Sequence, residues 1–432
     1  MAAITYVLFS VTLCVWTIKS IIYESRFPVI GYIFGITLLL CFVINSYLFC
    51  GNKRIRQGML MMAVFLNIRL SVGYCTWRDP HRLVEKEEYN VITISDMWKS
   101  AGIQEVVLVI ALFFVVSILI CHTKLFRIRG LNIVLMAVLP LVMIAGRLIG
   151  KKTGGSYLTV GGIMLFAIVL AGFPFVAATL LTMDENGYVG GNVKKMPWNL
   201  AGLLLYEGVL FFCCCLLNEY GLLLVIGVTG SLLFLLRCKG LWTKVCYSIA
   251  CMASALFIAV KVGHISQRLE VLLNPAHASN KETSETVLYV FRNLPRVGYW
   301  GNSIGDLSRR IFRQIDTDHV TVLLMNDYSV ILTGLVIILM MLFCRWLFVL
   351  ETGLCSYDRY LNLTAAIVFS TVVVMHVASN LGSFITAGVG MPFISRGSVN
   401  VIMYGVLAGI HAGLLGKEKY LECYEKEEEM EV

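Results

Sequence analysis

Residues 104–121 read QEVVLVIALFFVVSILIC, a nearly unbroken run of apolar side chains with one acidic residue near its start. An α-helix needs about 20 such residues to cross the hydrocarbon core of a bilayer, and it satisfies its own backbone hydrogen bonds where no water can. The run therefore predicts a transmembrane helix. Eleven similar runs lie at residues 4–22, 28–50, 57–74, 130–149, 157–183, 197–217, 220–236, 243–262, 328–349, 361–381 and 397–416.

The composition excludes a soluble globular protein. Of the 432 residues, 58% are hydrophobic and 14% are charged, whereas soluble domains carry roughly 25% charged and 45–50% apolar residues. The formal net charge of +8 comes without a basic stripe interleaved with aromatic residues, so it fits basic loops beside a membrane better than nucleic-acid binding. We expect an all-α polytopic membrane protein with about twelve transmembrane helices. The run at 157–183 is long for one span, which leaves room for a re-entrant or interfacial segment.

The cysteine pattern argues against a disulfide framework and against a zinc site. Most of the fourteen cysteines lie inside apolar runs, Cys213, Cys214 and Cys215 among them, and no CxxC pair occurs. At such positions cysteine acts as a small apolar side chain. We predict no metal site built by the protein alone.

Basic residues in short loops predict the orientation of the chain. Loops rich in Lys and Arg stay in the cytoplasm, and counting alternate loops places three basic clusters and both termini on that side. The large polar segment at 263–327 then lies outside, and the acidic tail at 417–432 lies inside. Lys151 and Lys152 fall in an outer loop, although lysines and arginines in short loops usually stay in the cytoplasm. The three clusters are Lys53, Arg54 and Arg56; Lys124, Arg127 and Arg129; and Arg237, Lys239 and Lys244.

Asp318 is the first candidate for chemistry. It follows Thr317 where the long outer segment meets the membrane, and a carboxylate that is partly desolvated at such a boundary can serve as a general base. Position alone supports a second interpretation equally well, in which Thr317 or Asp318 caps the N-terminus of the next helix.

Residues 388–398 read GVGMPFISRGS, and glycine and proline at this density break a helix and create a re-entrant turn. Ser395 and Arg396 are placed to face an anionic ligand near the N-terminus of the following helix. An ordinary connecting turn is the alternative. Glu219, with Tyr220 and Gly221, forms a tight outer turn that alone indicates only a helical hairpin.

Glu207 and His376 lie within predicted transmembrane runs. Ionisable groups at that depth are costly and usually face the interior of the bundle. They could line a cavity or a proton path, but a hydrogen bond from helix to helix is the favoured interpretation.

These outer segments, in this order, resemble the SEDS family, which comprises the FtsW, RodA and SpoVE proteins of bacterial cell-wall synthesis. The family's signature reads roughly G-V-x-L-P-F-I-S-Y-G-G-S, and the 388–398 segment matches it with Arg396 in place of tyrosine. The family's T-D-F segment matches Thr317, Asp318 and His319, and its D-x-G turn resembles the turn at Glu219. The stretch RLEVLLNP from Arg268 is similar to the opening of the family's large outer loop.

The resemblance implies a glycosyltransferase that polymerises lipid II at the outer face of the bacterial cytoplasmic membrane, together with a penicillin-binding-class transpeptidase. Asp318 matches the family's catalytic aspartate, which is proposed to deprotonate the attacking sugar hydroxyl. The leaving group is a polyprenyl diphosphate, so the site needs positive charge or a divalent cation, Mg²⁺ or Mn²⁺. The residues that we expect to bind substrate are Lys151, Lys152, Arg268, Glu219, Ser395 and Arg396.

The chain also departs from the family. A G-A-x-R-W-I segment and then Q-P-x-E-x-x-K are expected after Lys152, yet no Asp, Glu, Lys or Arg occurs between Lys152 and Asp184. Two helices precede the usual ten, and we divide the chain into N-terminal helices with an outer loop at 1–103 and a SEDS-like core at 104–432. The alternatives to a polymerase are a non-catalytic scaffold or regulator of wall synthesis, and a lipid transporter that uses Glu207 or His376.

Overall fold

The structure is a computed structural model that describes residues 52–77, 103–182, 197–277, 317–396 and 402–417, with short gaps inside the longer ranges. The predicted runs at 4–22 and 28–50 lie outside the described residues. The helices are α3 (Lys53–Trp77), α6 (Ile103–His122), the 3-10 turn η1 (Leu125–Arg127), α7 (Arg129–Ile149), α8 (Leu165–Thr182), α9 (Pro197–Leu217), α10 (Tyr220–Arg237), α11 (Leu241–Lys261), α12 (Gly263–Leu273), α14 (Val320–Asp327), α15 (Val330–Phe348), α16 (Ser356–Asn380) and a C-terminal helix, Ile402–Lys417.

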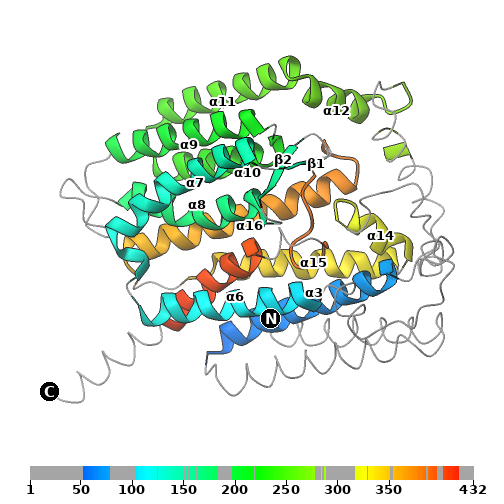
Figure 1. Ribbon diagram of the computed structural model, residues 1–432, viewed down its shortest axis with the longest axis horizontal. Coiled ribbons are helices and arrows are strands. Elements are labelled where there is room, and N and C mark those ends of the chain that lie inside the picture. The colour runs from blue at the N-terminus through cyan, green and yellow to red at the C-terminus, as the bar shows by residue number, and fades with distance from the viewer. Residues whose placement is uncertain are drawn as a thin grey trace.

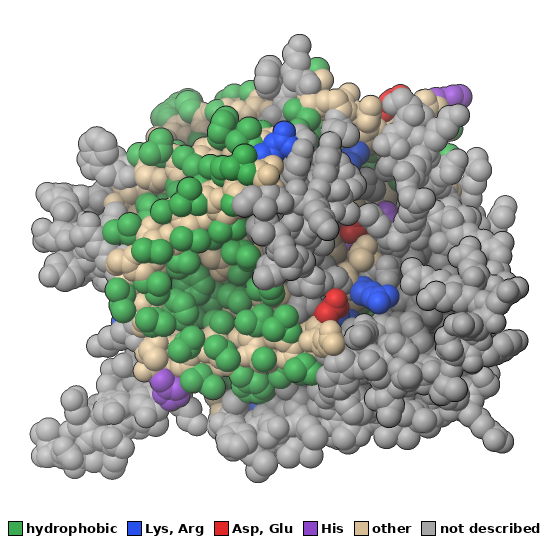
Figure 2. All heavy atoms as spheres, in the orientation of Figure 1, with side chains coloured by type: hydrophobic (Ala, Val, Ile, Leu, Met, Phe, Trp, Pro, Cys, Tyr) green, Lys and Arg blue, Asp and Glu red, His purple; other side chains and the backbone are tan. Residues whose placement is uncertain are grey.

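The long helices lie side by side, with α16 in the middle of the bundle (Figure 1). Among the described residues, six helices are long and apolar enough to cross a membrane: α6, α7, α9, α10, α15 and α16. Their outward faces are apolar, and Figure 2 shows hydrophobic side chains covering one face of the bundle. Soluble monomers rarely expose a continuous apolar surface of this kind. The chain is a multi-pass helical membrane protein, as the sequence predicts.

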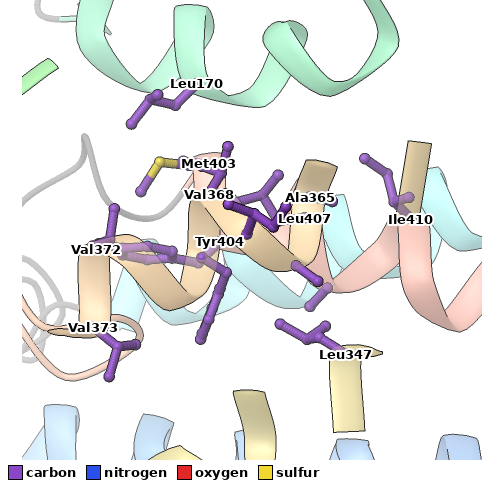
Figure 3. Close-up of a cluster of buried hydrophobic side chains, with 14 of the residues drawn as sticks. Leu170, Leu347, Ala365, Val368, Val372, Val373, Met403, Tyr404, Leu407 and Ile410 are labelled. Carbon is purple, nitrogen blue, oxygen red and sulfur yellow. The ribbon is translucent and has the colours of Figure 1, made fainter. Parts of the chain in front are cut away.

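The core of the bundle forms around α16. Val368 and Val372 of α16 are fully buried and pack with Leu170 of α8 and with Tyr404 and Leu407 of the C-terminal helix (Figure 3). Because α16 is surrounded by other helices, its exposure to lipid is small, and it can carry polar residues at little cost.

The run at 157–183 is not one helix. The strands β1 (Lys151–Thr153), β2 (Ser156–Val160) and β3 (Ile163–Met164) form an antiparallel sheet in the order β1-β2-β3, and α8 begins only at Leu165. Two-residue Gly-Gly pairs at 154–155 and 161–162 are typical of tight hairpin connections, and β2 is rich in residues that favour strands. Hydropathy alone reads this apolar stretch as helix, which is why the all-α prediction misses the small sheet.

The predicted basic loops meet at one end of the bundle. Arg127 of η1 forms an ion pair with Asp358 in the first turn of α16, and Lys417 donates to the same carboxylate at 2.9 Å. The backbone carbonyl of Arg54 accepts a hydrogen bond from Trp346. The guanidinium of Arg237 lies 5.6 Å from the ring centre of Tyr360, also near the start of α16. The opposite end of α16 therefore faces the side on which the sequence places the outer loops.

Helix α3 packs into this bundle although it falls within the predicted N-terminal part of the chain. Phe65 of α3 meets Phe343 of α15 edge to face, with ring centres 5.9 Å apart. The predicted boundary at residue 103 stays a prediction.

Candidate functional site

Asp318 lies in a turn, residues 317–319, that leads into α14 and is half-buried. The carbonyl oxygen of Asp318 accepts a hydrogen bond of 2.8 Å from the side-chain amide of Asn380, at the last residue of α16. The same amide donates to the carbonyl of His376 at 2.9 Å. The end of α16 thereby holds the backbone of the turn that carries the candidate base.

Arg268 lies close enough to Asp318 and to Glu219 for both carboxylates to act on its charge. Arg268 is on α12 and Glu219 immediately precedes α10. Burial lowers the pKa of the Arg268 guanidinium, and the negative charges of Asp318 and Glu219 act in the opposite direction. Two carboxylates and a guanidinium from three distant parts of the sequence are thus gathered in one electrostatic neighbourhood.

His319 adds an imidazole beside this group. Burial lowers the pKa of His319 to about 4, because the protonated ring loses its hydration there. At neutral pH the imidazole is therefore uncharged. In the motif resemblance His319 stands where the SEDS proteins have phenylalanine.

The segment 388–396, here called the signature loop, starts beside Asp318. Gly388 has a φ of +65°, and a Cβ added to it would lie 3.7 Å from Oδ2 of Asp318. Glycine adopts this left-handed conformation without the steric penalty of other residues. The loop backbone consequently comes close to the carboxylate.

His376 connects the signature loop to α14. It is fully buried, with Nδ1 at 2.8 Å from the carbonyl of Val389 and Nε2 at 2.9 Å from the hydroxyl of Thr321. Because a carbonyl can only accept, Nδ1 carries the proton and Nε2 accepts from Thr321. These contacts favour the interpretation of His376 as a hydrogen-bonded link between segments.

Ser395 is buried inside the signature loop. Its hydroxyl donates to the carbonyl of Thr317 at 2.6 Å and accepts from the backbone N–H of Met391 at 2.6 Å. Both partners belong to the protein backbone, so these hydrogen bonds hold the loop in place, and the predicted ligand contact of Ser395 stays a prediction. Arg396 follows at the end of the loop and is half-buried.

Phe393 anchors the middle of the signature loop. Its φ is +60°, which is unfavourable for a bulky residue and persists only where surrounding contacts enforce it. The ring stacks on Phe65 at 6.2 Å and contacts Phe343, Phe369 and Tyr404 at 5.5 to 5.7 Å between centres. Four helices therefore hold one strained loop residue.

Lys151 and Lys152 belong to β1, where they pair with Thr159 and Tyr157 of β2. The structure describes their backbone and not their side chains, so their predicted contact with substrate stays a prediction. Within the described residues, no group of three or more His, Cys, Asp or Glu side chains is arranged to hold a metal ion.

Glu207 lies on α9, 5% exposed, and packs against α10. A Cβ added to Gly230 of α10 would fall 1.6 Å from its Oε1, so the glycine leaves the room that the carboxyl group occupies. Glu207 is thus a packed interhelical residue.

Comparison with known proteins finds relatives in cell-wall synthesis. The probable peptidoglycan glycosyltransferase FtsW of Coxiella burnetii is 24% identical over 287 residues, which span 64% of this chain and 75% of that protein. The solved structure of the rod shape determining protein RodA of Thermus thermophilus matches with a TM-score of 0.54 and 15% identity, over 84% of this chain and 96% of RodA. The chain shares the fold of the SEDS proteins and resembles FtsW in sequence.

Two further comparisons complete this result. A structure described as showing the coordination of polymerization and crosslinking by a peptidoglycan synthase complex matches with a TM-score of 0.60 and 15% identity, over 83% of this chain and 97% of the matched one. A second Thermus RodA structure, with one aspartate changed to alanine, matches with a TM-score of 0.52. No family model matches the chain. At these identities the solved structures establish the SEDS fold alone.

Proposed function

We propose that this protein is a peptidoglycan glycosyltransferase that polymerises lipid II at the outer face of the bacterial cytoplasmic membrane. The observation that carries the proposal is the position of Asp318 beside the signature loop, where a Cβ on Gly388 would lie 3.7 Å from its Oδ2. The charge of Asp318 also acts on the Arg268 guanidinium. The FtsW relative is described as a probable enzyme of this kind. The basic loops at the opposite end of the bundle support a cytoplasmic position for that end and for both termini.

In the proposed reaction the carboxylate of Asp318 takes the proton of a sugar hydroxyl on the acceptor. The hydroxyl oxygen attacks the anomeric carbon of the growing chain, and the bond between that carbon and the diphosphate oxygen breaks. In this proposal Arg268 holds the diphosphate as its negative charge develops, and the carboxylate of Glu219 acts on the charge of Arg268. Lys151, Lys152 and Arg396 are further cations proposed for the lipid diphosphate.

The carboxylates of Asp318 and Glu219 are donors of the class that Mg²⁺ and Mn²⁺ prefer. Mg²⁺ is commonly bound through one or two carboxylates together with substrate phosphates, so Asp318 or Glu219 would hold a cation together with the lipid diphosphate. Such a cation would supply further charge neutralisation at the diphosphate. We expect a penicillin-binding-class transpeptidase as the partner, because the synthase-complex structure couples polymerization to crosslinking.

The test is polymerisation of fluorescent lipid II by the purified full chain, with and without the transpeptidase and with Mg²⁺ or Mn²⁺. We expect Asp318→Asn to lower the rate by at least about 100-fold, the usual contribution of a general base. Arg268→Ala should lower it about 10-fold or more. Glu270→Gln, on an exposed position of the same helix as Arg268, is the matched control and should polymerise at the wild-type rate.

Two results would overturn the proposal. If the wild-type protein forms no polymer under any of these conditions, the polymerase assignment fails. If Asp318→Asn polymerises like the wild type, Asp318 is not the base.

A non-catalytic role in the wall-synthesis complex is the second candidate, and one observation favours it. The charged residues that the family carries after the position of Lys152 are absent here. A scaffold would bind the transpeptidase and form no polymer, and Asp318→Asn would leave that binding unchanged.

A further inference from the structure

Arg69 is a buried cation that the proposed reaction does not use. It lies on α3 with 3% of its surface exposed. A guanidinium inside a membrane protein is costly unless it is paired and hydrogen-bonded, so the identity of its partners indicates why the bundle tolerates it.

The partners of Arg69 come from two other segments. Its Nη2 forms an ion pair with Glu105 in the first turn of α6, and its Nη1 donates to the backbone carbonyl of Ser395 in the signature loop. The planar fork of arginine can serve both partners at once, whereas the ammonium of lysine acts as a single point charge. Glu105 thus fixes the guanidinium, and the guanidinium holds the loop.

A continuous series of contacts leads from this ion pair to the candidate base. Arg69 binds the carbonyl of Ser395, and the hydroxyl of Ser395 binds the carbonyl of Thr317. Thr317 is the residue immediately before Asp318. The series therefore begins on α6 and ends one peptide bond from the proposed catalytic carboxylate.

The signature loop needs such support, because its conformation is strained. Phe393 is held at a φ of +60°, and strain of this kind persists only under external restraint. The aromatic contacts of Phe393 restrain its side chain. The hydrogen bond from Arg69 restrains the backbone two residues later, at Ser395, where the loop contacts the turn of Asp318.

We infer that Arg69, held by Glu105, is a positioning residue that fixes the signature loop and through it the orientation of Asp318. The link to catalysis rests on the proposed polymerase function, whereas the effect on loop conformation does not. Neither residue of the pair belongs to the proposed substrate contacts.

The test compares variants in the full chain reconstituted in lipid nanodiscs. The double variant Arg69→Met with Glu105→Met removes both charges together, so that no unpaired charge remains buried; replacements of this type are often neutral for stability. Arg69→Lys keeps the positive charge but replaces the planar fork by a single ammonium group, and is the conservative comparison. Glu105→Gln keeps an acceptor for the guanidinium and leaves its hydrogen bond to Ser395 in place.

Hydrogen exchange measures the loop directly. The backbone amides of Met391, Ile394 and Ser395 are bonded within the signature loop. In the double variant we expect them to exchange at least about tenfold faster, while amides in the middle of α16 keep their wild-type rates. Arg69→Lys should lie between the double variant and the wild type. Unchanged exchange in the double variant would overturn the inference, whatever the polymerase assay shows.

The polymerase assay tests the second half of the inference. We expect the double variant to lose at least about tenfold in kcat with little change in KM for lipid II, because the base is misplaced and the substrate contacts are kept. Faster loop exchange with wild-type kcat would show that the loop does not position Asp318. Faster loop exchange in a protein whose wild type forms no polymer would refute the proposed function and leave the effect of Arg69 on the loop standing.

Discussion

Gly388 is the residue at which the signature loop approaches the carboxylate of Asp318. Its φ of +65° belongs to the left-handed region, and a Cβ added to it would lie 3.7 Å from Oδ2 of Asp318. At the scale of single residues, the site therefore depends on the absence of a side chain as much as on charged groups.

We predict that Gly388→Ala destabilises the protein by about 1–2 kcal/mol, because an alanine in the left-handed region is strained, and slows polymerisation several-fold. Gly334→Ala is the control, because a Cβ at that position on α15 meets nothing within 4 Å. Thermal unfolding and lipid II polymerisation measure the two effects. A Gly388→Ala protein that matches the control in both would contradict the geometry of the loop.

His319 predicts a pH dependence of stability. The pKa of His319 is about 4 in the folded protein and about 6.5 in the unfolded chain. At a pH between these two values the unfolded state therefore binds more protons at this residue than the folded state does. The free energy of unfolding should therefore fall as the pH drops from about 6.5 towards 4, by on the order of 1–2 kcal/mol at pH 5, and stay constant above 6.5 as far as this group is concerned.

The variant His319→Phe carries the family's residue and removes the titrating group. We expect it to lose less stability than the wild type between pH 7.5 and pH 5, as measured by thermal unfolding at both values. An equal loss in the two proteins would show that other groups cause the acid sensitivity.

At the scale of elements, the C-terminal helix packs on α6 through a stripe of glycines. A Cβ on Gly405, Gly409 or Gly413 would lie 2.9, 2.8 and 2.6 Å from backbone carbonyl oxygens of α6. Lipid-embedded helices lack a hydrophobic force between them, and small residues at this spacing let their backbones approach closely. This contact fixes α6, and with it Glu105, against the helix that follows the signature loop.

We predict that Gly409→Ala destabilises the protein by on the order of 1–3 kcal/mol, because the backbone of Phe113 cannot move aside as a flexible side chain could. Gly208→Ala on α9, where a Cβ meets nothing within 4 Å, should change stability by less than about 0.5 kcal/mol. Thermal unfolding in detergent compares the two variants. Equal stabilities would mean that the close approach of α6 is not present in solution.

At the scale of the whole molecule, the two ends of the bundle differ in chemistry. Asp358 joins Arg127 of η1 and Lys417 of the C-terminal helix at the basic end. Asp318 lies at the other end of α16, where Asn380 binds its carbonyl oxygen, and the charges of Asp318 and Glu219 act on Arg268. The positive-inside rule predicts an orientation with the candidate site outside.

This orientation predicts the behaviour of fusion proteins. A green fluorescent protein attached after Val432 should fluoresce in intact bacteria, because it folds in the cytoplasm, and alkaline phosphatase at the same position should be inactive. Phosphatase inserted into the segment 263–327 should be active. The reverse pattern would place the Asp318 site in the cytoplasm and rule out lipid II polymerisation at the outer face.

Much of the fold is readable from hydropathy. The runs predicted at 197–217 and 220–236 agree closely with α9 and α10, because a lipid-facing helix must be apolar along its whole length. The sheet β1 to β3 is missed because apolar strands and apolar helices have the same hydropathy, and only spacing and β-propensity separate them. Motif resemblance likewise identifies Asp318, Arg268 and Glu219 as site residues without indicating that they meet.

The sequence by itself determined that this chain is a helical membrane protein and which segments carry its polar motifs, since these follow from local composition. Only the tertiary structure decided the contacts of Ser395 and Arg69. The hydroxyl of Ser395 donates to the carbonyl of Thr317, which is 78 residues away, and Arg69 donates to the carbonyl of Ser395, which is 326 residues away. Hydrogen bonds between such distant positions arise only from the packing of the helices.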